Sequence, residues 1–373
     1  MEITSLDERE PARLTVSVII CTRDRGDALL PTVRSILADA PTDGAMDLLV
    51  VDQSDGDSVR QALAQVEDAR LRYRRELSRG LSAARNAGIR ATEGELIAFT
   101  DDDCVVEAGW LAALRAAFAA HPEAGLVFGA VIAADHDPTQ GFLPCFEARE
   151  GLLTRRRMRA GAGHWGMGAN MALRRSAVER IGAFDELLGA GARLRSAEDS
   201  DYVLRAVESG LGVHYASAAS VTHYGFRPTR EARRLLCDAA RATGAVYAKH
   251  LRSGELFALK LLSYDVSGRL RNVVWHVFHR RRVTGLNALR YELIGFVRGW
   301  RLPYRLDGQA RTPVFVAPPV ALPALEERPL GAADAVKQDT HSLESSGSPQ
   351  PVVSLVWRRS GDEPDDSLSH GLE

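Results

Sequence analysis

Cysteine is scarce in this 373-residue chain, and its few copies are scattered. The four cysteines, at positions 21, 104, 145 and 237, form no Cys-x-x-Cys pair. This spacing argues against a disulfide framework and against a zinc site. It is typical of a protein that resides in a reducing compartment.

Long apolar runs and a strong net charge are missing as well. No uninterrupted apolar stretch approaches the length of a membrane-spanning helix, and the acidic residues 1–10 lack the apolar core of a secretory signal. The net charge is −2, so we expect no nucleic-acid partner. With 45% hydrophobic and 26% charged residues, the composition is that of an ordinary globular protein, and we expect a cytoplasmic one.

The glycine fingerprint of dinucleotide-binding folds is also absent. The first expected strand, residues 15–20, runs into Cys-Thr-Arg-Asp-Arg-Gly instead of Gly-x-Gly-x-x-Gly, which argues against a dinucleotide dehydrogenase. What the first half does contain is a regular alternation of strand and helix patterns. This alternation predicts an α/β fold with a mainly parallel central sheet flanked by helices.

Polar side chains follow three of the expected strands at the point where each strand ends. Thr22 follows the first strand, Asp52 the second, and three aspartates the apolar run at 95–100. In open α/β sheets, ligands bind beyond the carboxyl ends of the strands. These side chains are therefore expected at one rim of the sheet, where they would form a binding site.

The three consecutive aspartates are the most informative of these groups. Asp101, Asp102 and Asp103 would repel one another unless a cation is present, and hard oxygen ligands suit Mg²⁺ or Mn²⁺. Two plainer interpretations stay open. The cluster is a solvated loop, or Asp103 helps to begin the expected helix that carries Trp110.

Further residues have the chemistry to bind a nucleotide. The carboxylate of Asp52 can accept a hydrogen bond from a nucleobase N–H, although the segment that includes Ser54 is also a good turn sequence. Arg85 has the fork geometry that binds phosphate, and Asn86 is an unfavourable residue in a helix interior. The alternative is a surface arginine beside a helix asparagine without function.

A candidate base and a further metal ligand lie later in the chain. Glu198 and Asp199 open an expected helix, and a carboxylate there can take a proton from an attacking hydroxyl. The same pair resembles a helix-capping sequence, because acidic groups are favourable at a helix N-terminus. His223 follows an extended run, and its imidazole either binds a divalent metal or has a structural role.

The pattern changes towards the C-terminus. We expect an N-terminal extension at 1–14, an α/β domain at 15–229, a basic helical extension at 230–311, and a Pro/Ser-rich, acidic tail without regular structure at 312–373. Residues 248–311 mix bulky apolar residues with arginines. They either pack on the α/β domain or contact an anionic membrane surface, which would place the protein on the inner face of the membrane.

Taken together, these segments resemble inverting glycosyltransferases of family 2, which have the GT-A fold. The resemblance runs from about Val16 to His223 and rests on the order of several modest motifs. They are Val-Ser-Val-Ile-Ile-Cys-Thr-Arg-Asp-Arg, Val-Val-Asp-Gln-Ser, Gly-Leu-Ser-Ala-Ala-Arg-Asn-Ala-Gly-Ile, Phe-Thr-Asp-Asp-Asp-Cys, Gly-Ala-Asn-Met-Ala-Leu-Arg-Arg, Ile-Gly-Ala-Phe-Asp-Glu and Ala-Glu-Asp-Ser-Asp-Tyr-Val-Leu-Arg.

The resemblance implies a role for each candidate residue. The nucleotide and diphosphate would lie near Thr22, Arg23, Asp52, Ser54, Arg85, Asn86, Asp101 and Asp102. The sugar and acceptor would lie near Trp165, Gly168 and Asn170. Asp101 and Asp103 would be the outer members of the family's Asp-x-Asp motif, and His223 would be a further ligand of Mg²⁺ or Mn²⁺. Glu198 and Asp199 would be the family's Glu-Asp pair, with Asp199 as the base.

The activity implied is transfer of a sugar from a nucleotide-diphosphate donor to an acceptor hydroxyl, with inversion at the anomeric carbon. The acceptor would be a glycan, a lipid-linked glycan or a small molecule, in the synthesis of cell wall, polysaccharide, glycolipid or glycoconjugate. Two other functions stay open. One is an inactive nucleotide-sugar-binding or scaffolding protein of the same fold, and the other is a nucleotidyltransferase, which would not need the Glu198-Asp199 pair.

Overall fold

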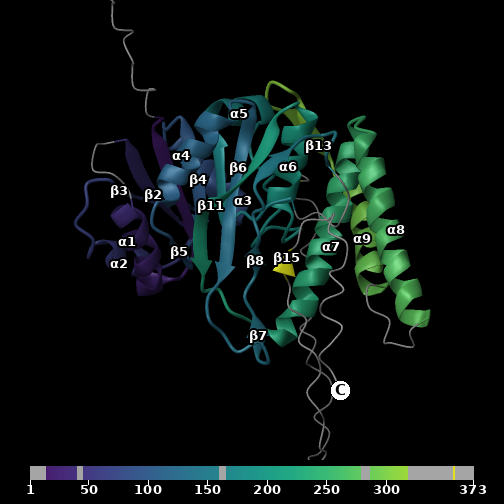
Figure 1. Cartoon of the computed structure of the whole chain (residues 1–373), viewed down its shortest axis with the longest axis horizontal. Helices are drawn as coiled ribbons and strands as arrows, with labels where there is room; N and C mark the ends of the chain where they lie inside the picture. The colour runs from purple at the N-terminus through teal and green to yellow at the C-terminus, as the bar shows by residue number, and fades with distance from the viewer. Residues whose placement is uncertain (1–13, 40–44, 159–164, 279–285, 318–355, 358–373) are drawn as a thin grey trace, which may run out of the picture.

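A computed structural model describes residues 14–39, 45–158, 165–278, 286–317 and 356–357 (Figure 1). Within these residues, eleven strands form one curled sheet. They are β1 (Val16–Thr22), β2 (Met46–Asp52), β3 (Leu71–Arg75), β4 (Leu96–Asp101), β5 (Cys104–Val106), β6 (Ala124–Ala133), β8 (Cys145–Phe146), β9 (Gly151–Leu153), β10 (Asn170–Arg174), β11 (Gly212–His223) and β15 (Val356–Trp357). Two short ribbons join β7 (Gly141–Phe142) to β12 (Arg227–Pro228) and β13 (Tyr304–Asp307) to β14 (Thr312–Phe315).

Helices flank this sheet and continue beyond it. The described helices are η1 (Gly26–Leu29), α1 (Leu30–Asp39), α2 (Ser58–Leu63), α3 (Leu81–Arg90), α4 (Trp110–Ala120), α5 (Arg175–Ile181), α6 (Glu198–Glu208), α7 (Thr229–Arg252), α8 (Phe257–Phe278) and α9 (Leu286–Arg301). Helix α3 packs on β1 and β2, whereas α4 packs on β6 and β11. None of them combines the length and the hydropathy needed to cross a membrane.

The predicted mainly parallel α/β sheet is confirmed. Strands β3, β2, β1 and β4 are adjacent and parallel, β10 runs antiparallel between β4 and β6, and β11 is parallel to β6. The central strands are apolar throughout because helices cover them, and Val18, Ile19 and Ile20 of β1 are fully buried. The carboxyl ends of β1, β2 and β4 therefore meet at one edge of the sheet.

The three long C-terminal helices lie side by side, with α7 next to the sheet and α8 outermost (Figure 1). Helices α7 and α9 approach closely through glycines. A methyl group on Gly244 would collide with the carbonyl of Glu292, and one on Gly295 with the carbonyl of Arg241. This spacing requires residues without a Cβ at both positions.

The hairpin β13–β14 returns the chain to the α/β domain, across the boundary expected between residues 311 and 312. The Thr312 hydroxyl donates to the carbonyl of Ile181 at 2.6 Å, and the Phe315 N–H donates to Asp185 Oδ2 at 2.6 Å. The expected tail residues 318–355 and 358–373 lie outside the described residues, as do 1–13 of the N-terminal extension.

A buried ionic network joins α7 to α6. Lys249 Nζ lies 2.6 Å from Asp185 Oδ2 and 2.8 Å from Asp201 Oδ1. Asp201 also pairs with Arg205 at 2.9 Å and with His250 at 3.1 Å, and none of these side chains is exposed. Burial alone would raise the pKa of Asp201, but the neighbouring cations outweigh it and hold that pKa well below its usual range. The network fixes α7 against the helix that begins at Glu198.

Candidate active site

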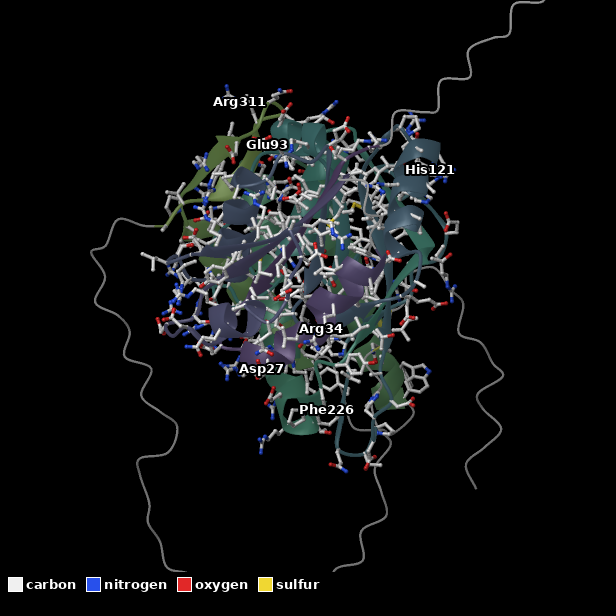
Figure 2. The ribbon with its side chains drawn as sticks, turned by 90° about the vertical axis from the view of Figure 1, so that its left-hand side faces the viewer. Asp27, Arg34, Glu93, His121, Phe226 and Arg311 are labelled. Atoms are coloured by element: carbon white, nitrogen blue, oxygen red, sulfur yellow. The ribbon has the colours of Figure 1, made fainter. Side chains whose placement is uncertain are left out.

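The polar rim predicted at the carboxyl ends of the strands is present. In the sheet register Thr22 lies opposite Asp52, and Cys21 lies opposite Asp101. Figure 2 shows Asp27, which follows β1, in the lower part of the view and Glu93, which precedes β4, in the upper part. The strand order thus brings the ends of β1, β2 and β4 together.

An arginine that the sequence did not single out bridges two members of the acidic triplet. Arg25 Nε donates to Asp102 Oδ1 at 3.1 Å, and Nη2 donates to Asp103 Oδ2 at 2.5 Å. The Thr22 hydroxyl donates to Asp102 Oδ2 at 2.6 Å. Burial raises the pKa of Asp102 to about 6, despite these donors. Asp102 is therefore bound to protein groups through both of its oxygens.

Asp103 and His223 face each other with their ligand atoms correctly oriented for a cation. His223 Nε2 lies 3.3 Å from Asp103 Oδ1, while Nδ1 donates to the Pro144 carbonyl at 2.8 Å and fixes the ring. The ligand atoms of Asp103, Cys104 and His223 lie within 4.8 Å of one another. Burial raises the pKa of the Cys104 thiol far above its usual range, so it stays neutral. The carboxylate and imidazole therefore fit a divalent cation, with the thiol as a bystander.

The two groups of this pair shift each other's ionisation: although burial lowers the pKa of His223, its hydrogen bonds to Asp103 and to the Pro144 carbonyl raise it, so a bound cation would have to displace the imidazole proton. Burial by itself raises the pKa of Asp103, but the hydrogen bond and charge of His223 and the charge of Arg25 outweigh it, so the pKa lies below its usual value. Asp101, a third exposed, has a raised pKa chiefly because of burial, partly offset by Arg85. At the rim, Asp103 therefore ionises at a lower pH than Asp101.

The residues expected around the nucleobase lie at the ends of β1 and β2. Asp52 is fully buried, and its Oδ1 accepts from the Ser54 N–H at 2.8 Å and its Oδ2 from the Tyr73 hydroxyl at 2.9 Å. The Ser54 hydroxyl in turn accepts from the Asp24 N–H at 2.8 Å. Arg23 is exposed and pairs with Asp24 at 3.3 Å. Asp52 orders the loop at the rim through these contacts.

Arg85 connects the acidic rim to the candidate base. Its guanidinium is buried and donates to Glu198 Oε1 and to the Gly168 carbonyl, each at 3.2 Å, and lies 4.0 Å from Asp101 Oδ1. A methyl group at position 168 would collide with this guanidinium, which explains a glycine there. Arg85 thus holds β4, α6 and the segment before β10 together.

Three further predicted residues, Asn86, Asn170 and Trp165, are buried. The side chain of Asn86 donates to the Phe184 carbonyl at 3.0 Å and accepts from the Phe184 N–H at 2.8 Å. Asn170 is fully buried and accepts from the Trp110 indole N–H at 2.9 Å. These residues determine how the walls of the site are packed.

Asp199 lies in the first turn of α6, and the backbone just before this helix is strained. Its Oδ2 accepts from the Gly168 N–H at 3.2 Å and its Oδ1 from the Ser200 N–H at 2.6 Å. No side chain caps the helix, and the preceding Arg195 and Ala197 have φ values of 53° and 68°, in the left-handed region. Such strain is uncommon outside functional sites. The capping box is therefore absent, although Asp199 lies in the first turn of α6, where an acidic group is favourable.

The electrostatics of Asp199 suit a proton acceptor. Burial, together with the nearby charge of Glu198, raises its pKa to about 7, while Arg85 opposes that shift. A group with such a pKa changes its protonation state near neutral pH. Similarly, Asp103 does not begin the helix with Trp110, because β5 intervenes and Asp39 accepts from the Gly109 N–H at 2.6 Å.

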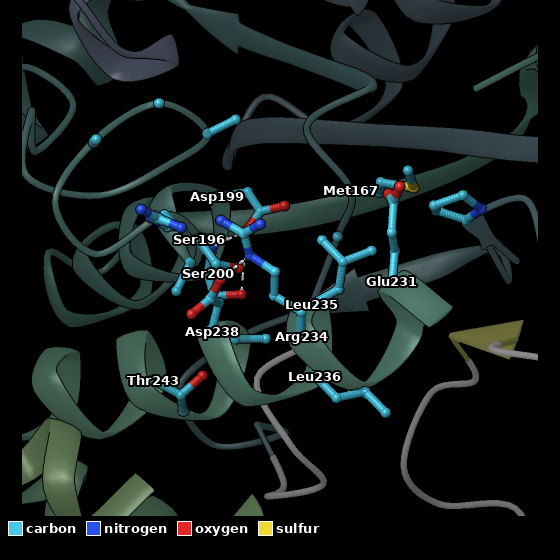
Figure 3. A pocket seen from close by; sticks show the side chains of 18 of the residues that line it. Met167, Ser196, Asp199, Ser200, Glu231, Arg234, Leu235, Leu236, Asp238 and Thr243 are labelled. Atoms are coloured by element: carbon cyan, nitrogen blue, oxygen red, sulfur yellow. Dashed lines mark hydrogen bonds and ion pairs between the residues drawn. The ribbon is translucent and has the colours of Figure 1, made fainter. Parts of the chain in front are cut away.

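A cavity of about 740 Å³ opens beside Asp199 (Figure 3). Asp199, Ser196 and Met167 line one wall, and α7 forms the other with Glu231, Arg234, Leu235, Leu236 and Asp238. The sequence did not indicate the contribution of α7, because these residues lie more than thirty positions beyond Asp199 and carry no motif. The cavity thus combines acidic, basic and apolar groups.

A known protein family matches part of the α/β domain. Residues 17–182 match the family described as glycosyl transferase family 2. The match covers somewhat less than half of the chain, which is therefore similar to glycosyl transferase family 2 over these residues, and the fold is of the GT-A type.

Individual relatives are more distant. The chain is 30% identical over 124 residues to a glucosyl-dolichyl phosphate glucuronosyltransferase of Haloferax volcanii, covering 32% of this chain and 39% of that protein. It is 29% identical over 224 residues to a pre-mycofactocin glycosyltransferase of Mycobacterium tuberculosis, covering 55% and 45%. The chain thus spans less than half the length of each of these curated relatives.

A solved structure supports the fold. The mannosyltransferase PcManGT from Pyrobaculum calidifontis, in complex with GDP-Man and Mn²⁺, superposes with a TM-score of 0.50 at 17% identity. The match covers 78% of this chain and 88% of that one.

Proposed function

We propose that the protein is a metal-dependent, inverting glycosyltransferase. Its donor is a nucleotide-diphosphate sugar and its acceptor carries a hydroxyl group. The observation that carries this proposal is the position of Asp199, a carboxylate with a pKa of about 7 that lines a large cavity and is linked through Arg85 and Glu198 to the acidic rim. The family 2 match supports the same class of reaction.

In this proposal the acceptor hydroxyl occupies the cavity and gives its proton to Asp199. Its oxygen forms a bond to the anomeric carbon while the bond from that carbon to the diphosphate oxygen breaks. The electron pair leaves with the nucleoside diphosphate. Attack from the side opposite the leaving group inverts the anomeric carbon, and no protein nucleophile takes part.

Asp101, Asp103 and His223 would hold the divalent cation, Mg²⁺ or Mn²⁺. When bound, such an ion neutralises charge on a diphosphate leaving group. Thr22, Arg23, Asp52 and Ser54, from the ends of β1 and β2, would border the nucleotide. The Mn²⁺ in the complex of PcManGT makes Mn²⁺ the first ion to test.

The acceptor would enter the cavity between Asp199 and α7. Leu235 and Leu236 supply apolar surface, while Arg234 and Glu231 supply charge, so the cavity suits an acceptor with both characters. The curated relatives have names that refer to a dolichyl phosphate glycoside and to pre-mycofactocin. Lipid-linked and small-molecule acceptors are therefore the first to screen.

Metal-dependent nucleotide binding tests the proposal directly. We expect UDP, TDP or GDP to raise the melting temperature only when Mn²⁺ is present, because a ligand at about 100 times its Kd stabilises a protein by about 2.7 kcal/mol. Asp103→Asn is expected to weaken Mn²⁺ binding, measured by calorimetry, at least about tenfold, because it removes an anionic ligand.

Asp102→Asn is the matched control, since Asp102 is bound to Thr22 and Arg25. It should retain most of the Mn²⁺ affinity. Nucleotide binding that is equally strong without metal, or equal Mn²⁺ affinity in both variants, would contradict the metal assignment. Release of pyrophosphate from a nucleoside triphosphate, with no release of a nucleoside diphosphate from nucleotide-diphosphate sugars, would identify a nucleotidyltransferase.

A further inference from the structure

Helices α8 and α9 expose a cationic surface that carries no acidic side chain. The sequence from Leu256 to Leu306 contains ten lysine or arginine residues and only two acidic ones, Asp265 and Glu292. Both acidic side chains are buried in the structure. The exposed charges of this segment are therefore all positive, although the whole chain has a net charge of −2.

The two acidic groups are used for internal contacts. Asp265 Oδ2 accepts from the Tyr247 hydroxyl at 2.6 Å, and Glu292 Oε2 accepts from Arg269 Nε at 2.7 Å. By contrast, Arg271, Arg290, Arg298 and Arg301 are all exposed. Internal pairing thus removes the negative charge from the surface and leaves the arginines there.

Bulky apolar side chains lie among these arginines. We call the following exposed residues the α8–α9 face: Leu270, Val274, Trp275 and Phe278 of α8, and Leu286, Leu293, Val297 and Trp300 of α9. On α9 they recur with Arg290 at the three- and four-residue spacing of one helix face, and Phe278 of α8 is 80% exposed. Helix α8 is the outermost of the three C-terminal helices in Figure 1.

We propose that the α8–α9 face docks on the surface of an anionic lipid bilayer. Aromatic and aliphatic side chains beside arginines are the composition of helices that lie in a membrane interface. The absence of exposed acidic groups removes the repulsion that such a surface would otherwise produce. This docking does not depend on the proposed sugar transfer, because the face shares no residue with the cavity at Asp199.

Vesicle sedimentation with the full chain tests the docking. The protein is expected to bind vesicles of equal parts phosphatidylcholine and phosphatidylglycerol, and to stay in solution with phosphatidylcholine alone. Rising salt should release it. Arg290→Glu combined with Arg298→Glu should weaken binding about fivefold or more for each arginine. Val274→Ser combined with Phe278→Ser should also weaken it, because apolar area is lost from the interface.

Two exposed positions elsewhere supply controls of matched chemistry. Arg34→Glu on α1 and Leu77→Ser between β3 and α3 should bind vesicles like the unchanged protein, and melting curves verify that every variant is folded. Asp199→Asn should also bind vesicles normally, so a failure of the proposed sugar transfer is distinguishable from a failure of docking.

The docking proposal is overturned if the intact protein does not bind anionic vesicles, or if the α8–α9 variants bind them as well as the controls do. Self-association or RNA binding that these variants abolish, without vesicle binding, would overturn it too.

Discussion

At the level of single residues, the Asp199 carboxylate can be reached from the cavity and has a raised pKa. Its carboxylate lines the cavity, yet burial raises its pKa to about 7. Its two hydrogen bonds come from backbone N–H groups of Gly168 and Ser200, which fix its direction without neutralising it. Both properties are expected of a general base.

Replacing Asp199 by Asn should remove the base and keep the shape. We expect the turnover number to fall by about 10²–10⁴-fold, the range typical of general-base catalysis. Nucleotide affinity should change little, and the melting temperature should fall only modestly, because the single amide oxygen can accept one of the two backbone hydrogen bonds. Single-turnover kinetics measure the loss of catalysis, and calorimetry measures the nucleotide affinity. Asp238→Asn, on the opposite wall of the cavity, is the control; an equal loss in both variants would argue against Asp199 as the base.

The pH dependence of the reaction follows from the same pKa. The base must be ionised, and burial has moved its ionisation upwards, so the active form is present above about pH 7 and is lost as the pH falls. We expect kcat/KM to decline about tenfold for each pH unit below that value. Residual activity of Asp199→Asn should not follow this profile. An unchanged kcat/KM between pH 5 and pH 8, values that bracket the shifted pKa by about one to two units, would contradict the assignment.

The sequence predicted the residues at strand ends better than those that orient them. Asp52, Asp101, Asp103 and Thr22 could be placed at one rim because the carboxyl ends of adjacent parallel strands must coincide. The role of Arg25 was not predicted, because a turn sequence does not indicate which carboxylates an arginine within it will contact. The contacts of Asn86 and Asn170 depend on backbone groups 40 or more positions away, as the partners Phe184 and Ala130 illustrate.

At the level of elements, the close packing of α7 and α9 depends on glycines. Gly295 faces the carbonyl of Arg241, and Gly244 faces that of Glu292, so the two backbones are nearly in contact. The helical pattern of both segments was predictable from the sequence. Their mutual approach was not, because a glycine in a helical segment signals a weak helix as readily as a tight contact.

A single methyl group should therefore separate the two helices. We expect Gly295→Ala to lower the free energy of unfolding by about 1–3 kcal/mol through overpacking, although alanine is the better helix former. Gly268→Ala in α8 is the matched control, because a methyl group there meets only an Arg271 side-chain nitrogen at 3.9 Å. It should raise stability by up to about 1 kcal/mol. Urea denaturation measures both, and changes of the same sign would refute the packing argument.

At the level of the whole molecule, one lysine joins two regions that the sequence suggests are separate. Lys249 of the helical extension lies between Asp185 and Asp201 of the α/β domain, with no exposure to solvent. Composition alone places a boundary near residue 230, since the strand pattern ends there. Lys249 and Asp185 are 64 positions apart, so no local sequence pattern indicates that they form an ion pair.

Removing that lysine should leave two carboxylates buried without their shared cation. We expect Lys249→Met to lower the free energy of unfolding by about 3–5 kcal/mol, the cost of breaking a buried ion pair on one side. Lys260→Met, an exposed position on α8, should change it by less than about 0.5 kcal/mol. Thermal and urea unfolding give the comparison, and similar values for both variants would show that Asp185 and Asp201 find other partners.

The same lysine limits how far the chain can be shortened. A fragment that ends before position 249 would keep Asp201 without its lysine, and one that ends before 315 would lose the N–H that Phe315 donates to Asp185. The family-matched segment 17–182 contains neither carboxylate, although Thr312 bonds to its last turn at Ile181. The smallest piece able to fold unaided therefore extends well beyond the recognisable family segment, through the hairpin β13–β14.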